Sequence, residues 1–218
     1  MQLIKNWQSE PSEPQLFLRS VEDCTMQRRD FLTICSVWFA WPVLANTRLP
    51  MTPTQAEGPF YPLNTIPVRS NLILNQSSLI GKTLELSGHV KTPEGKPMKQ
   101  VRVEIWQCDG AGVYDHPRQP GVEQFDRNFA GSGATESNEE GRFNFTTLYP
   151  VPYTGRPPHI HVKLWLGNRE LLTTQLYLQG QIGNEWWGGN ERELLQLELK
   201  DAKGSAHAHF DFIVASLS

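Results

Sequence analysis

Short apolar segments alternate with turn sequences along the chain after Gly81, and this pattern limits what the chain can fold into. The turns combine residues that favour tight reversals, as in Pro93-Glu94-Gly95, Asp109-Gly110 and Glu140-Gly141. No long segment has the apolar period of a helix. Short strands at this spacing are typical of two packed sheets, so we predict an all-β fold, an antiparallel β-sandwich, over residues 81–218. The predicted strands are Thr83–Val90, Val101–Gln107, Arg142–Thr146, His159–Leu166, Leu171–Leu178, Leu194–Lys200 and His207–Val214.

Composition narrows the classes of function. Of the 218 residues, 39% are hydrophobic and 20% are charged, which suits one compact core and is too apolar for intrinsic disorder. The formal net charge is −3 and no block of like charges occurs. We therefore expect one folded domain with no nucleic-acid partner and no attraction to an anionic membrane.

An export-type pattern lies near the N-terminus. Arg28 and Arg29 precede an uncharged run from Phe31 to Leu44, which Ala45 follows. This layout resembles a twin-arginine signal peptide over residues 26–45, and the run is shorter than the roughly 20 apolar residues of a membrane span. We expect export to the periplasm or the extracellular space and no membrane span in the mature protein; a buried core helix is the alternative.

Residues 1–25 do not fit the same signal. Residues 1–30 carry five acidic and four basic side chains, whereas the start of a signal peptide should be positive. If translation starts at Met26, the net charge at the start of the signal peptide becomes positive. We therefore interpret residues 1–25 as a mis-assigned extension, with Met1 as the alternative initiator. Loss of the presequence would leave Cys108 as the only cysteine, which allows no intramolecular disulfide.

The predicted strand His159–Leu166 has two different faces. Alternation along a strand separates two sets of residues, His159, His161 and Lys163 on one face and Ile160, Val162 and Leu164 on the other. The apolar face is expected to be the core face, so the histidines should face a site or water. Together with Tyr114 and Tyr153 they supply two phenols and two imidazoles, which is the donor set of a mononuclear ferric centre.

Several segments together resemble the intradiol ring-cleavage dioxygenases, the family of the protocatechuate 3,4-dioxygenase and catechol 1,2-dioxygenase type. The similarity covers nearly all of residues 52–180 and includes an extended N-terminal arm, predicted over residues 46–80. The segments that carry it are Thr54-Gln55-Ala56-Glu57-Gly58-Pro59-Phe60-Tyr61, Leu86-Ser87-Gly88-His89-Val90, Val103-Glu104-Ile105, Gly112-Val113-Tyr114, Pro152-Tyr153, Arg156-Pro157-Pro158-His159-Ile160-His161 and Thr174-Gln175-Leu176-Tyr177.

The resemblance implies that Fe(3+) is bound by Tyr114, Tyr153, His159 and His161. A phenol has a pKa near 10 in water, but a trivalent ion makes the phenolate the bound form. Two anionic oxygens also favour Fe(III) over Fe(II). Tyr149 competes for the second phenolate position, and the Pro-Tyr pattern favours Tyr153.

The resemblance further implies that Arg156 and Gln175 lie next to the substrate ring, where they stabilise the negative charge that builds during ring attack. Pro157-Pro158 fixes an extended link, which should project Arg156 and His159 toward the same side. A surface ion pair is the alternative for Arg156, and a plain strand position is the alternative for Gln175.

Three other features are weaker candidates. His207 and His209 repeat the His-x-His spacing without a nearby phenol or thiolate, and we expect an edge-strand feature there more than a metal site. Trp186 and Trp187 could line an aromatic pocket or cover the core. Cys108 has no neighbouring histidine that would activate it as a nucleophile.

The expected function follows from the resemblance: an exported Fe(III) enzyme that uses O2 to cleave a small aromatic diol between its hydroxylated carbons, giving a muconate-type dicarboxylate. Tyr153 would leave the metal and take a substrate proton. Only five residues separate Tyr153 from His159, a shorter link than is usual in the family. The sequence therefore does not predict which substituents the substrate ring carries. The catechol-cleaving branch of the family has a helical dimerisation region, and this sequence shows no counterpart of it. The oligomeric state is therefore not predicted, and a homo-oligomer stays an open alternative.

Two other functions compete with this one. The first is a secreted β-sandwich that binds iron or catecholic compounds without turnover. The second is a zinc hydrolase that uses His159 and His161, although the sequence shows no third ligand with a general-base carboxylate nearby.

Overall fold

The computed structural model describes residues 48–153, 155–179, 189–202 and 205–215, all within a compact unit that runs from Asn46 to Ser218. The predicted extension and signal peptide, over residues 1–25 and 26–45, lie outside the described residues, as do Trp186 and Trp187.

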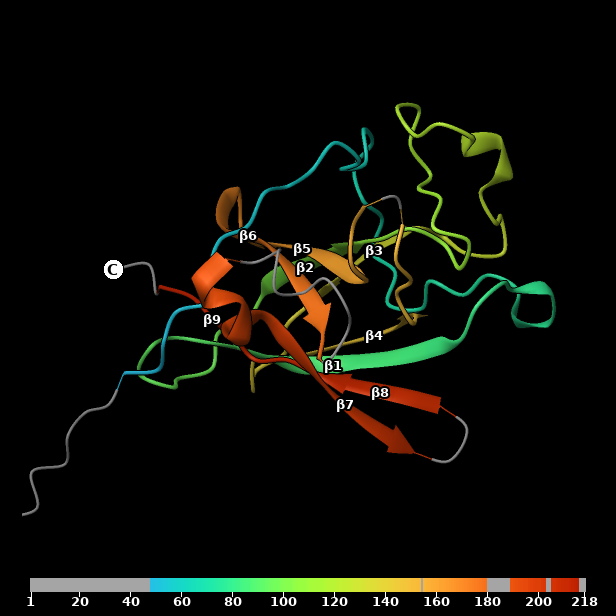
Figure 1. The fold of residues 1–218 in the computed structure, drawn as a ribbon. Coiled ribbons are helices and arrows are strands. Elements are labelled where there is room, and N and C mark those ends of the chain that lie inside the picture. Colours follow the sequence, from blue (N-terminus) through green and yellow to red (C-terminus); the bar gives the residue numbers. More distant parts are fainter. Residues whose placement is uncertain (1–47, 154, 180–188, 203–204, 216–218) are drawn as a thin grey trace, which may run out of the picture. The chain divides into compact units, whose positions relative to one another are not determined.

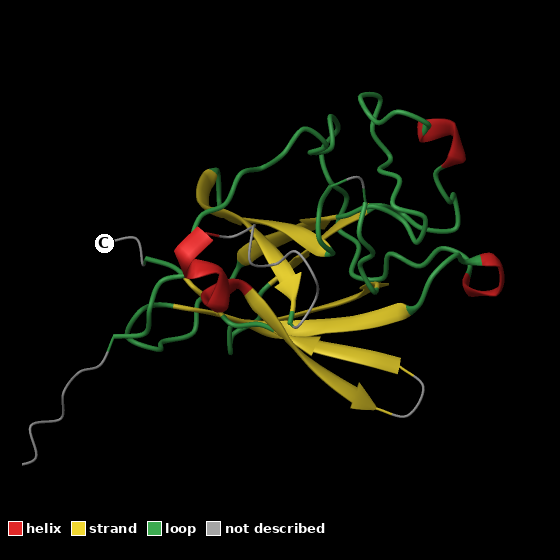
Figure 2. Ribbon diagram, in the orientation of Figure 1, coloured by secondary structure: helices red, strands yellow, loops and turns green. Residues whose placement is uncertain are grey.

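Strands and short 3-10 turns make up the regular structure, and the described residues contain no α-helix (Figure 2), which confirms the all-β class. The 3-10 segments are η1 (Gln76–Ser78), η2 (Val122–Gln124) and η4 (Gly189–Leu195). The strands are β1 (Thr83–Lys91), β2 (Val101–Trp106), β3 (Ser132–Glu136), β4 (Arg142–Leu148), β5 (His159–Leu166), β6 (Arg169–Leu178), β7 (Gln196–Ala202), β8 (Ser205–His209) and β9 (Phe212–Ile213).

The strands form two packed layers (Figure 1). Hydrogen bonding follows the order β3-β2-β5-β6-β7-β8-β1-β4, and β9 pairs with β1. β7 joins the layers because it pairs with β6 on one side and β8 on the other. Ile105 and Ile160 from one layer and Leu86 and Phe145 from the other share one buried core, as expected for a sandwich. The pairings β1–β8, β1–β9 and β6–β7 are parallel, so the predicted antiparallel sandwich is in fact mixed.

The C-terminal prediction was wrong in two respects. The predicted strand His207–Val214 is interrupted after His209, and β8 lies inside the sheet between β7 and β1 and not at an edge. At this break the chain lies against Gly88, where a Cβ would be 1.7 Å from the carbonyl oxygen of Phe210. The backbone at Phe210 can approach β1 this closely only because Gly88 has no side chain.

Strand β5 is buried on both faces, because the N-terminal arm covers the face opposite the core. Ile160, Val162 and Leu164 enter the core as predicted, while His159, His161 and Lys163 on the other face are only 1–5% exposed. The arm is held by backbone hydrogen bonds from Thr52 to Ile213 and from Gln55 to Thr173. The histidines therefore face an enclosed site and not water.

Candidate metal centre

The four predicted donors meet in one cluster built from three parts of the chain. His159 and His161 lie on β5, Tyr114 on the loop that follows β2, and Tyr153 on the β4–β5 loop. The ring centroids of Tyr114 and Tyr153 are 5.4 Å apart, those of Tyr153 and His159 5.5 Å, and those of Tyr114 and His161 6.0 Å. Two phenols and two imidazoles thus lie side by side in one cluster.

The two imidazoles are arranged as a pair of ligands. Their Nε2 atoms lie 3.1 Å apart, close to the roughly 3 Å that separates two nitrogens bound at about 2.1 Å to one ion. Nδ1 of His159 lies 2.7 Å from the carbonyl oxygen of Pro157, which fixes the tautomer that leaves Nε2 free to coordinate. Burial lowers the pKa of His159 to about 4 and that of His161 well below its usual value, so both rings are neutral.

The two phenols differ in burial. Tyr114 is 2% exposed, and its buried hydroxyl lies beside the Tyr153 hydroxyl without a well-formed hydrogen bond. Burial, reinforced by neighbouring Tyr153, holds the pKa of Tyr114 well above 10. Burial also raises the pKa of Tyr153, which is only half-buried, and the Arg156 guanidinium opposes the rise.

A ferric ion fits this donor set. A buried hydroxyl without a partner costs about 1–3 kcal/mol, a cost that a bound cation removes. The cation would also reverse the protonation preference of Tyr114, because a trivalent charge outweighs the loss of solvation of the phenolate. Two phenolates and two neutral imidazoles match the preference of Fe(III) for hard anionic oxygen. The residues that would hold the ion are Tyr114, Tyr153, His159 and His161.

Arg156 and Gln175 form a polar pair beside the cluster. Nη2 of Arg156 donates to Oε1 of Gln175 at 2.6 Å, and Gln175 lies directly opposite His161 on β6. The Gln175 amide donates to the carbonyl oxygen of Ala56 at 2.6 Å, and the Tyr177 hydroxyl donates to Oε1 of Gln175 at 3.2 Å. Gln175 therefore links the arm, the guanidinium and the histidine strand.

Aromatic residues that the sequence reasoning missed enclose the donors. Trp106 stacks on His161 with centroids 4.8 Å apart and an interplanar angle of 11°, and Phe60 stacks on Tyr114 at 4.7 Å. A Cβ on Gly58 would lie 3.2 Å from Cε1 of His161, so the arm approaches the ring closely. Gly58 in the arm was the available signal, because a glycine in an extended segment often marks a close backbone approach.

Comparison with known proteins decides the family. The family model described as Dioxygenase matches residues 56–184, more than half of the chain. This segment includes all four candidate ligands as well as Arg156 and Gln175. The chain belongs to the intradiol ring-cleavage dioxygenase family.

Individual relatives agree with this membership. The β chain of protocatechuate 3,4-dioxygenase from Burkholderia cepacia is 35% identical over 111 residues, 46% of each chain. Catechol 1,2-dioxygenase from Candida albicans is 31% identical over 144 residues, 55% of this chain and 45% of the relative. The dioxygenase domain of a carbohydrate-binding fusion protein from Streptomyces sp. SirexAA-E has a TM-score of 0.64 at 32% identity and covers 77% of this chain and 100% of its own. The chain spans about half the length of the curated relatives it matches.

Other candidate residues of this intradiol-family chain lie elsewhere. Tyr149 packs against the main core under Lys82 and not in the donor cluster. Cys108 is buried, and burial followed by the charge of Asp109 raises its pKa to about 12, so it remains an unreactive thiol. His207 is exposed, whereas His209 lies beside His89 and Asp211.

An ion pair fastens the arm over the histidine face. The Lys163 ammonium, with a side chain 7% exposed, pairs with Glu57 and lies 3.5 Å from Glu170. It also lies 4.2 Å from the ring centroid of Tyr61, whose hydroxyl donates to Glu104. Lys163 therefore acts as a buried anchor for Glu57-Gly58-Pro59-Phe60.

Glu57→Gln is expected to destabilise the iron-loaded protein by about 1–3 kcal/mol. It removes the main partner of a buried ammonium, and the loss stays below the roughly 3–5 kcal/mol of a fully buried pair because Glu57 is 43% exposed and Glu170 remains. Urea unfolding at pH 7 measures the change. Glu139→Gln, which removes an exposed pair with Lys99, is the control and should change stability by less than about 0.5 kcal/mol. Equal effects of the two variants would contradict the anchoring role.

Proposed function

We propose that the protein is a non-haem Fe(III) dioxygenase that cleaves a catechol-type ring between its two hydroxylated carbons, incorporating both atoms of O2 to give a muconate-type dicarboxylate. The observation that carries the proposal is the convergence of Tyr114, Tyr153, His159 and His161, with the Arg156–Gln175 pair beside them. Relatives named protocatechuate 3,4-dioxygenase and catechol 1,2-dioxygenase support the aromatic diol as substrate class.

The bound Fe(III) ion would supply the Lewis-acid and redox centre at which catechol and O2 meet. The protein's own residues bind and orient the reactants. Tyr114, His159 and His161 are almost fully buried, whereas Tyr153 is only half-buried. Tyr153 Oη is therefore the group that can move aside and accept a proton from a substrate hydroxyl.

The Arg156–Gln175 pair supplies oriented donors on the substrate side. The Arg156 guanidinium cannot act as a metal ligand because it has no acceptor lone pair. Gln175 holds it at 2.6 Å and is itself fixed by the carbonyl oxygen of Ala56, so the charge is in place before the ring acquires electron density. A donor that needs no reorganisation favours the transition state over the bound substrate.

Metal analysis with an absorption spectrum, followed by oxygen uptake with a panel of catechols, tests the proposal. We expect about one iron per chain, a visible tyrosinate-to-iron band, and stoichiometric O2 consumption with a ring-opened diacid as product. A coloured protein that consumes no O2 would favour the alternative, a β-sandwich that binds iron or catecholic compounds without turnover. A colourless zinc protein would favour the hydrolase, yet His159 and His161 belong to no three-residue group of His, Cys, Asp or Glu within the described ranges.

The cellular location is a separate proposal. We propose export by the twin-arginine route, supported by Arg28, Arg29 and the uncharged run that follows. No helix in the part of the chain that the structure describes is long and apolar enough to cross a membrane.

Changing Arg28 and Arg29 together to Lys is expected to block export and leave the precursor in the cytoplasm, because a receptor reads the paired arginines. Cell fractionation with immunodetection measures the distribution. The same double change should leave the folded domain intact, because both arginines precede the compact unit that begins at Asn46. Undiminished export of the double variant would show that another route is used.

A further inference from the structure

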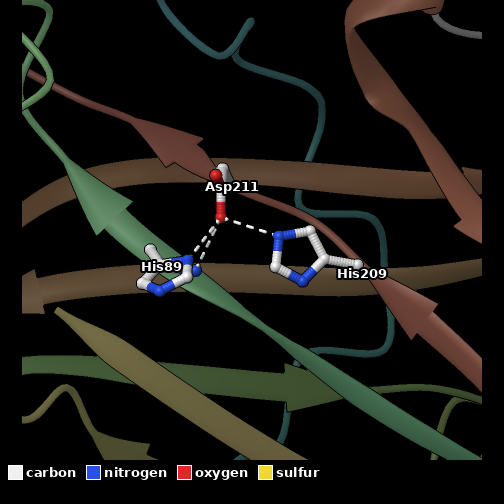
Figure 3. Close-up of side chains that lie close together, drawn as sticks. All are labelled: His89, His209 and Asp211. Carbon is white, nitrogen blue, oxygen red and sulfur yellow. Dashed lines mark hydrogen bonds and ion pairs between the residues drawn. The ribbon is translucent and has the colours of Figure 1, made fainter. Parts of the chain in front are cut away.

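A second cluster of metal-ligand side chains lies on the other layer of the sandwich. His89 is on β1, His209 ends β8, and Asp211 lies between β8 and β9. Oδ1 of Asp211 lies 2.9 Å from Nδ1 of His89 and 3.0 Å from Nε2 of His209 (Figure 3). The three side chains are only 26–37% exposed, so they form a partly enclosed group and not a chance meeting of surface chains.

The separations suit one transition-metal ion. Ligand atoms bound at about 2.0–2.1 Å in tetrahedral geometry lie roughly 3.3 Å from one another. The carboxylate-to-imidazole distances of 2.9 and 3.0 Å are already near that value, and all three donor atoms lie within 4.8 Å of one another. A small rotation of each side chain would open the space for an ion.

The backbone holds these residues in place. β1 pairs with β8 in parallel register, with Ser87 opposite His209, and then with β9. The backbone amide of His89 donates to Oδ1 of Asp211 at 2.9 Å. The Phe210 backbone packs closely against Gly88 and donates a hydrogen bond to the carbonyl oxygen of Ser87, which holds Asp211 beside His89. Ligands on paired strands lose little freedom on binding an ion, which favours affinity.

The electrostatics also suit a cation. Lys91 and His89 both contact the Asp211 carboxylate at hydrogen-bond distance, which favours its ionised form. Nζ of Lys91 binds Oδ2 at 2.6 Å and leaves Oδ1 directed at the histidines. Such a contact orients a carboxylate ligand from the side away from the ion. A cavity of about 380 Å³ lies beside His209 and Asp211. Glu198, which lies opposite His209 on β7, also lines this cavity and adds negative charge.

We propose that His89 Nδ1, His209 Nε2 and Asp211 Oδ1 bind a divalent transition metal of the Zn²⁺ type, separate from the iron centre. Two nitrogens and one carboxylate select such an ion over Ca²⁺ or Mg²⁺, which prefer all-oxygen ligands. The cavity beside His209 and Asp211 leaves the fourth position open to water. The site ties the C-terminal strands β8 and β9 to β1, so its role is to stabilise the sandwich.

Zinc retention by the iron-loaded protein tests this site. After equilibrium dialysis against micromolar Zn²⁺, elemental analysis should give about one zinc more per chain in the wild type than in His209→Gln. His207→Gln is the matched control, because His207 is an exposed histidine two residues away on the same strand, and it should keep the wild-type value. The visible iron band, followed in the same samples, shows whether zinc has displaced iron.

Thermal unfolding gives an independent measurement. Zn²⁺ at about 100-fold over its Kd should raise the Tm of the wild type and of His207→Gln by several degrees, and Ca²⁺ should not. His89→Gln should abolish the shift as His209→Gln does, and it carries the test if His209→Gln does not fold. The proposal is overturned if His89→Gln or His209→Gln retains as much zinc as the wild type, or if the wild type retains none.

Discussion

Tyr114→Phe is expected to remove most of the visible absorption of the iron-loaded protein and to lower its activity by roughly 100-fold or more. The substitution deletes the more buried phenolate of the proposed centre. The ring itself can stay in place, stacked on Phe60 at 4.7 Å, and its hydroxyl makes no well-formed hydrogen bond that would be lost. The fold should therefore survive, and the stability of the metal-free protein should stay the same or rise by up to about 1–3 kcal/mol, the cost of the buried hydroxyl. Iron content, the absorption spectrum and far-ultraviolet circular dichroism measure these effects together.

Tyr153→Phe and Tyr149→Phe complete the same experiment. Tyr153→Phe should shift or bleach the band and slow turnover, since it removes both an oxygen ligand and the proposed proton acceptor. Tyr149→Phe is the matched control, a tyrosine on the same loop region that packs against the main core, and it should leave the band unchanged. A bleached Tyr149→Phe beside an unchanged Tyr153→Phe would show that the second phenolate has been assigned to the wrong residue.

Arg156→Leu should lower kcat by roughly 10²–10³-fold while iron content stays at the wild-type level, the scale of loss for one preorganised donor. The guanidinium is held by Gln175 at 2.6 Å and contributes charge to the site without being a ligand. The effect on KM should be smaller, because the stabilised charge builds only as the ring is attacked. Steady-state oxygen uptake with the best catechol measures both constants.

Two variants separate a chemical role of Arg156 from a structural one. Arg156→Lys should recover only part of the lost activity. The lysine ammonium is a point charge and does not reproduce the planar guanidinium that donates to Gln175. Arg142→Leu, at an exposed arginine that begins β4, is the control and should keep full turnover. Loss of iron in Arg156→Leu, or a kcat within about twofold of wild type, would contradict the proposed role.

Strand β5 shows why part of the candidate site could be predicted from the sequence. Its period-two alternation separates Ile160, Val162 and Leu164 from His159, His161 and Lys163 whatever the strand pairs with, and the structure puts the first set into the core. The bounds of β5 were predicted without error because both faces follow one regular pattern. In contrast, β3 (Ser132–Glu136) was missed, since Ser-Gly-Ala-Thr-Glu has no apolar alternation and the strand lies at the end of the sheet order.

The sequence by itself determined the all-β class, the turn positions, the two faces of β5 and the donor types, because these depend on local periodicity and side-chain chemistry. Only the tertiary structure decided what covers the histidine face. Lys163 and its partner Glu57 are 106 residues apart, and no local pattern reports that contact. The same holds for His89 and Asp211, 122 residues apart, which meet because β8 pairs with β1 inside the sheet. Strand order is set by which packing buries the most apolar surface, a property of the whole chain.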